Sequence, residues 1–117
     1  MAKKIMVIDD DPIIVKYLVN LFSDNGYETC TAANGVEAFE VAKKEKPDMI
    51  TLDLEMPEEW GTRFYRKLSK DAELKDTPVI VISGMASRHL SIKKAVAYLS
   101  KPFDSDKLMV TVRKILD

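Results

Sequence analysis

The sequence predicts an α/β protein with a doubly wound parallel sheet, and three observations lead to this fold class. Four short apolar runs, Ile5–Ile8, Met49–Leu54, Val79–Ile82 and Ala95–Leu99, are continuous, which is typical of strands covered on both faces. Segments whose apolar residues have helical spacing separate these runs. Strands that alternate with helices form βαβ units with parallel strands and right-handed crossovers. We therefore expect five strands and five helices in one open sheet.

The first helix and the second strand have clear local signals. Asp11-Pro12 can begin a helix, with Asp as the N-cap and Pro at the first helical position. Asn25-Gly26 can end it. The segment Tyr27–Ala32 mixes polar and apolar residues, as expected for a strand near an edge. The first helix should bury one apolar face, made of Ile13, Ile14, Tyr17, Leu18, Leu21 and Phe22.

The sequence signals for the remaining helices differ in strength. Asn34 and Glu37 have the spacing of a capping box, and Gly61–Lys70 carries the next helical pattern. Asp104 can cap a last helix near the C-terminus. The stretch Ala86–Ala95 shows only a weak helical pattern, so we predict a fourth helix that is shortened or irregular.

The composition excludes several other classes of protein. A length of 117 residues predicts one domain over 1–117. The 18 basic and 19 acidic residues give a net charge of −1, which argues against binding to nucleic acid or to a membrane surface. Cys30 and His89 are the only residues of their types, which excludes an intramolecular disulfide and zinc motifs with paired histidines. No apolar run approaches the roughly 20 residues of a membrane span, and the short apolar run after Met1–Lys4 does not have the pattern of a signal peptide, so we expect a cytoplasmic protein.

Polar residues follow four of the five predicted strands. Asp9 and Asp10 come after the first strand, Asp53 ends the third, Ser83 follows the fourth and Lys101 follows the fifth. Because ligands of such sheets bind outside the carboxyl ends of the strands, these groups should converge in one crevice. Alone, each has a simpler explanation as a turn, a helix cap or a surface residue. Together, they predict a site.

The chemistry of this set points to phosphoryl transfer. Neighbouring carboxylates repel each other, and a divalent cation with oxygen ligands, Mg²⁺ or Mn²⁺, relieves that repulsion. A carboxylate can attack phosphorus and form an aspartyl phosphate. An ammonium group and a hydroxyl can then contact the phosphoryl oxygens.

The motifs that surround these residues resemble a known family, the bacterial response-regulator receiver domain of two-component signalling, which includes the chemotaxis regulators. The resemblance extends from Lys3 to about Ile115. It implies a flavodoxin-like receiver fold with the strand order 2-1-3-4-5. The motifs that carry it are Val7–Pro12, Leu52–Pro57 with Gly61, Val81–Gly84 and Tyr98–Asp104.

The resemblance also implies roles for the acidic residues. Asp53 matches the phosphoacceptor, and Asp10 matches the direct metal ligand. Asp9 matches a ligand that acts through water, and Glu55 a ligand through its backbone carbonyl. The implied cofactor is Mg²⁺, or Mn²⁺ in its place.

Three further residues match the family's switch. Lys101 matches the lysine that pairs with the phosphoryl group, Ser83 the switch hydroxyl and Tyr98 the aromatic switch residue. Only 18 positions separate Ser83 from Lys101, about one helical turn fewer than is usual in the family. The surface that such domains commonly use for output is therefore in question.

The resemblance implies a signalling protein and not an enzyme. Its partners would be a sensor histidine kinase or a histidine phosphotransfer protein, an unknown output partner and, on phosphorylation, a second copy of the chain. The main alternative is a phosphorylation-independent interaction module with the same fold. A second alternative is a phosphatase with an aspartate nucleophile, which the pair Asp53 and Glu55 suggests.

Overall fold

The computed structural model describes residues 2–53, 60–83, 97–100 and 104–117. Strands and helices alternate along most of this length. In the described part of the chain, no helix is long and apolar enough to cross a membrane. The elements are β1 (Lys4–Ile8), α1 (Pro12–Asp24), β2 (Glu28–Ala32), α2 (Gly35–Glu45), β3 (Met49–Leu52), α3 (Trp60–Lys70), β4 (Val79–Ser83), β5 (Ala97–Ser100) and α4 (Ser105–Leu116).

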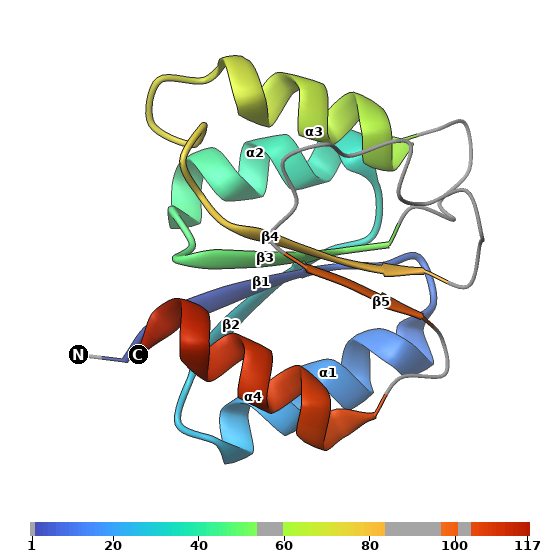
Figure 1. Ribbon diagram of the computed structural model, residues 1–117. Coiled ribbons are helices and arrows are strands. Elements are labelled where there is room, and N and C mark those ends of the chain that lie inside the picture. Colours follow the sequence, from blue (N-terminus) through green and yellow to red (C-terminus); the bar gives the residue numbers. More distant parts are fainter. Residues whose placement is uncertain (1, 54–59, 84–96, 101–103) are drawn as a thin grey trace.

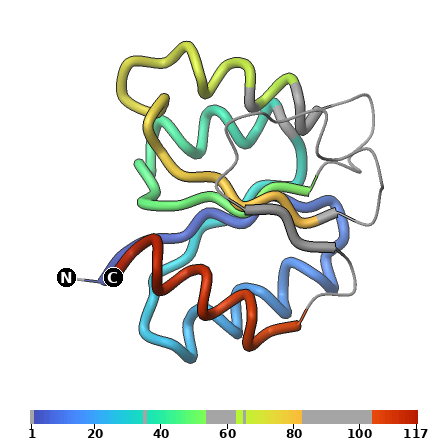
Figure 2. The backbone as a smooth tube through the Cα atoms, in the orientation of Figure 1, coloured from blue at the N-terminus to red at the C-terminus, as the bar shows by residue number. Residues whose placement is uncertain are grey.

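The strands form one sheet, covered on both faces by helices. Its strand order is β2-β1-β3-β4-β5, and every neighbouring pair is parallel. Helices α2 and α3 lie on one face of the sheet, and α1 and α4 lie on the other (Figure 1). Figure 2 shows the chain passing from β1 through α1 on one face, and then from β2 through α2 on the opposite face. The predicted α/β class with a parallel sheet is confirmed.

The core has one apolar cluster on each face of the sheet. In β1, Met6 and Ile8 belong to the cluster under α2 and α3, whereas Ile5 and Val7 belong to the cluster under α1 and α4. All four side chains are almost fully buried. This two-sided burial explains why the strand sequences are continuous apolar runs.

Three helices begin at capping residues that the sequence predicts. Asp11, Asn34 and Asp104 each accept a hydrogen bond from a backbone amide two or three residues later, at 2.9, 2.8 and 2.8 Å. Gly26 has a φ of +89°, which suits its place after α1. Lys46 ends α2 in the left-handed region with a φ of +48°, a position that usually favours glycine.

Some boundaries differ from the predictions. The third strand was predicted to reach Leu54, whereas β3 ends at Leu52, because its partner β1 ends at Ile8, the residue that pairs with Leu52. Asp53 therefore follows the strand, and residue 54 lies outside the described residues. The predicted irregular helix over Ala86–Ala95 also lies outside them.

Candidate functional site

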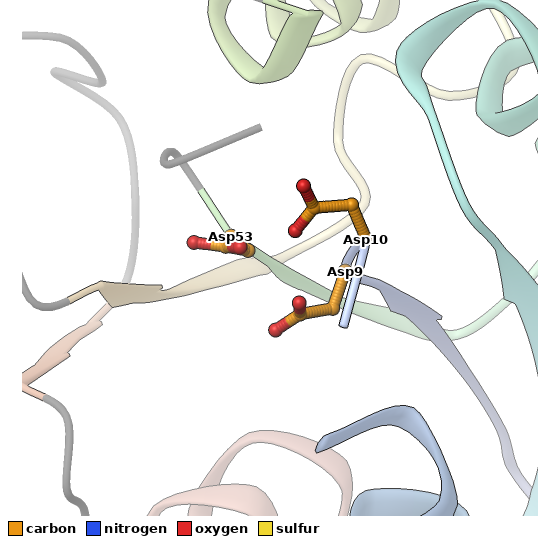
Figure 3. A group of neighbouring side chains, drawn as sticks. All are labelled: Asp9, Asp10 and Asp53. Atoms are coloured by element: carbon orange, nitrogen blue, oxygen red, sulfur yellow. The ribbon is translucent and has the colours of Figure 1, made fainter. Parts of the chain in front are cut away.

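Three aspartates come together where β1 and β3 end. These strands are neighbours, and the pairing of Ile8 with Leu52 places Asp9 and Asp53 directly after matched positions. Asp10 follows Asp9 in the turn that leads into α1. Figure 3 shows the three carboxylates grouped at this edge of the sheet. One carboxylate oxygen from each aspartate lies within 4.8 Å of those of the other two.

The three carboxylates differ in their exposure to solvent. Asp9 is 3% exposed and Asp53 is 2% exposed, whereas Asp10 is open to solvent. The amide of Asp53 donates to the carbonyl of Ile8 at 3.0 Å, and the amide of Asp11 donates to Oδ1 of Asp9 at 2.9 Å. These bonds fix the backbone that carries the two buried acids. Ionised carboxylates this close together repel one another, and the three oxygens could hold a metal ion between them.

A cavity of about 530 Å³ lies beside the acidic cluster. Asp9 and Asp10 form part of its wall, and Val15, Lys16 and Glu37 line it from α1 and α2. Helix α1 therefore lines the cavity beside the acids with both apolar and charged side chains.

Exposed apolar side chains lie on the same two helices. Ile13 is 76% exposed, Tyr17 is 47% exposed and Val36, near the start of α2, is 61% exposed. The prediction that Ile13 and Tyr17 belong to the buried face of α1 is wrong. Leu18 and Phe22 make the buried stripe, while Ile13 and Tyr17 lie one residue earlier in each turn and so face away from the sheet. The i, i+4 spacing alone could not separate these two stripes.

The other predicted site residues are placed only by their backbone or lie outside the described part of the chain. Ser83 is the last residue of β4 and pairs with Ser100, and Tyr98 lies in β5 opposite Val81. Since the strands are parallel, the ends of β4 and β5 lie at the same edge of the sheet as the acidic cluster (Figure 1). Glu55 and Lys101 lie outside the described residues.

Sequence and structure comparisons identify the class of this protein. Residues 5–113 match the model of the response regulator receiver domain, and the chain belongs to this family. It is thus a receiver domain of two-component signalling. The chain is 35% identical over 116 residues to protein Rrf1 of Nitratidesulfovibrio vulgaris. The alignment covers 99% of this chain and 84% of that protein. It is 31% identical over 120 residues to the polar-differentiation response regulator DivK of Brucella anthropi. That alignment covers 99% of this chain and 98% of DivK.

Solved structures with the same fold support this assignment. The chemotaxis protein CheY4 of Vibrio cholerae matches with a TM-score of 0.91 and 29% identity, over 99% of this chain and all of the other (100%). A response regulator from Thermotoga maritima matches with a TM-score of 0.84 and 32% identity, over 99% and 98% of the two chains. These likenesses confirm the predicted flavodoxin-like receiver fold.

Proposed function

We propose that this receiver domain accepts a phosphoryl group on Asp53 in a Mg²⁺-dependent reaction, and that phosphorylation changes a surface read by a partner. The observation that carries the proposal is the grouping of Asp9, Asp10 and Asp53, with one oxygen from each within 4.8 Å of the others. Family membership makes phosphoryl acceptance the natural use of such a group. The protein acts as a stoichiometric acceptor and not as an enzyme, because its own carboxylate is consumed until the phosphoryl group is removed.

The donor set fits a hard divalent cation. All three side chains offer carboxylate oxygens, which suit Mg²⁺ or Mn²⁺. Asp9 and Asp10 would hold the ion together with Asp53, and the resemblance adds the backbone carbonyl of Glu55. When bound, the ion would neutralise the clustered carboxylates and the charge of the incoming phosphoryl group.

The reaction at Asp53 transfers one phosphoryl group from a phosphohistidine. A carboxylate oxygen of Asp53 attacks phosphorus, a P–O bond forms, and the P–N bond to the donor imidazole breaks. The imidazole nitrogen leaves with the electron pair of that bond. Asp53 is only 2% exposed and Asp10 reaches solvent, so we expect the phosphoryl group to enter from the side of Asp10.

The switch follows from the new charge on Asp53. A phosphoryl group adds about 1.5–2 negative charges. By family resemblance, Lys101 and Ser83 would contact the phosphoryl oxygens, and the side chain of Tyr98 would then move toward the interior of the domain. Phosphorylation shifts the equilibrium between two conformations only by the difference in free energy that these contacts make between the two.

The surface beside the site suits a protein donor. Ile13, Tyr17 and Val36 expose apolar area on α1 and α2, next to the cavity that Lys16 and Glu37 line. We therefore propose that a sensor histidine kinase or a histidine phosphotransfer protein docks across the start of α1. Apolar side chains beside the cavity would exclude water while the phosphoryl group transfers.

Intact-mass spectrometry after incubation with acetyl phosphate tests the proposal. We expect the mass to increase by one phosphoryl group with Mg²⁺, and no increase with chelator or in the Asp53→Asn variant. Beryllofluoride binding by the wild type, followed by NMR, controls for rapid hydrolysis. Absence of both the adduct and beryllofluoride binding would favour the phosphorylation-independent interaction module instead.

A further inference from the structure

Four cationic side chains form one exposed surface on α3, and none of the three clustered aspartates lines it. They line a hollow of about 250 Å³ to which no other described residue contributes. All four are exposed, and their i, i+3, i+4, i+7 spacing places them on one face of the helix. We call this the α3 basic surface, made of Arg63, Arg66, Lys67 and Lys70.

The helix is held so that this surface faces outward. Phe64 and Leu68, on the opposite side of α3, are each 1% exposed and belong to the core cluster shared with α2. The Nζ atom of Lys67 lies 5.7 Å from the centre of the Phe39 ring on α2, within the range of a cation–π contact. The core therefore fixes the direction of the four cations.

Among the described residues, nearby cations form ion pairs, and those of the α3 basic surface form none. Lys43 contacts Asp71 at 3.0 Å and Glu73 at 2.8 Å, and Lys46 contacts Glu73 at 3.4 Å. None of the ion pairs between described residues involves the α3 basic surface. Like charges at i and i+4 on a helix repel one another, so this arrangement opposes helix stability unless an anion binds there.

We propose that the α3 basic surface binds an acidic segment of a partner protein. The surface extends about 10 Å along the helix axis, which matches two turns of a helix that carries carboxylates at the complementary spacing. Its two arginines can bind carboxylates through two parallel hydrogen bonds, and its two lysines add point charge.

Two other anionic partners fit less well. A nucleic acid would meet a chain with a net charge of −1 and a basic area confined to one helix. An anionic membrane would need apolar side chains beside the cations. Among the residues whose side chains the structure describes, the exposed large apolar ones lie on α1, α2 and α4: Ile13, Tyr17, Val36 and Val110.

The test measures fluorescence anisotropy with labelled helical peptides and the full chain. One alanine-rich peptide of about 16 residues carries glutamates at i, i+3, i+4 and i+7, and a matched peptide carries glutamines. The variant Arg66→Gln with Lys70→Gln removes two charges from the surface. Lys107→Gln with Lys114→Gln removes two exposed charges from α4 and is the matched control. Circular dichroism checks that both variants fold.

We expect the glutamate peptide to bind the wild type and the α4 control equally, and the α3 variant about tenfold more weakly. Raising NaCl from about 50 to about 300 mM should weaken binding about tenfold, because the charges are exposed. The glutamine peptide should not bind. Equal loss in both variants, or no binding by the wild type, would overturn the proposal. The proposal would also be overturned if the wild type bound a short single-stranded oligonucleotide more tightly than the glutamate peptide. Tighter binding to vesicles of phosphatidylcholine with one-third phosphatidylglycerol would overturn it in the same way.

Discussion

Thr51 is a buried residue whose side-chain hydroxyl forms no hydrogen bond within the described part of the chain. It lies in β3, is 1% exposed, and its hydroxyl has no hydrogen-bond partner among the described residues. Burying an unsatisfied hydroxyl costs free energy, so Thr51→Val, which keeps the shape of the side chain, should raise the free energy of unfolding by about 1 kcal/mol. Urea denaturation measures the change.

A second threonine provides the control for this substitution. Thr31, in β2, is exposed, so Thr31→Val should change the free energy of unfolding by less than about 0.5 kcal/mol. A loss of stability in Thr51→Val would show that its hydroxyl makes a favourable contact.

Residue-scale roles at the site differ in how far the sequence could predict them. Asp9, Asp10 and Asp53 could be grouped because parallel strands bring their carboxyl ends to one edge of the sheet. The unequal exposure of the three could not be predicted, because it depends on how the surrounding elements pack. Burial also raises the pKa of the Cys30 thiol to about 11, with the charge of Glu45 adding to the shift, and this too depends on packing.

At the scale of the element, the start of α4 depends on one carboxylate. Asp104 accepts hydrogen bonds from the amides of Asp106 at 2.8 Å and Lys107 at 3.4 Å. Asp104→Ala should lower the free energy of unfolding by about 1 kcal/mol, because two amides at the helix start lose their partner. Asp104→Asn retains a capping oxygen and should recover most of the loss in the same denaturation assay. Equal loss in both variants would contradict the capping role.

A pH-dependent contact joins α2 to the turn after α3. Hydrogen bonds from Lys43 hold the pKa of Asp71 and that of Glu73 below their ordinary values of 3.8 and 4.5, and Glu73 and Asp71 in turn raise the pKa of Lys43. The carboxylates therefore stabilise the fold above their ordinary pKa values. This contribution is lost as the pH falls through their lower folded-state values.

The variant Lys43→Gln tests this contact by thermal unfolding across pH. Its melting temperature should be below that of the wild type at neutral pH, and the difference should shrink as the pH falls below the ordinary pKa of Asp71, 3.8. Lys75→Gln removes an exposed charge for which no ion pair is found among the described residues, so it should change little at any pH. A difference for Lys43→Gln that is independent of pH would contradict the account.

Elements were predictable where their signals are local. Asp11, Asn34 and Asp104 were correctly assigned as caps because each bonds to an amide within three residues. The end of α2 carries no such signal, since Lys46 occupies the left-handed position in place of glycine. The contact of Lys43 with Asp71 joins residues far apart in the sequence, so no local pattern could predict it.

At the scale of the whole molecule, the strand order of the sheet brings the site residues together. Asp9 and Asp53 are distant in the chain but adjacent in space, because β1 and β3 pair in register. The alternation of strands and helices in the sequence was sufficient to predict that these two residues lie at the same edge of the sheet. The outward faces were less predictable: the exposed Ile13 and Tyr17, and the α3 basic surface, depend on how each helix is rotated against the sheet.

The central claim is that Asp53, and neither of its two acidic neighbours, receives the phosphoryl group. Borohydride reduction of the phosphorylated protein converts an acyl phosphate to an alcohol, so peptide mass spectrometry can locate the modified residue. We predict homoserine at position 53 in samples treated with acetyl phosphate and Mg²⁺, and aspartate at this position when Mg²⁺ is chelated. Homoserine at position 9 or 10, or at none of the three positions despite a phosphoryl adduct, would contradict the account.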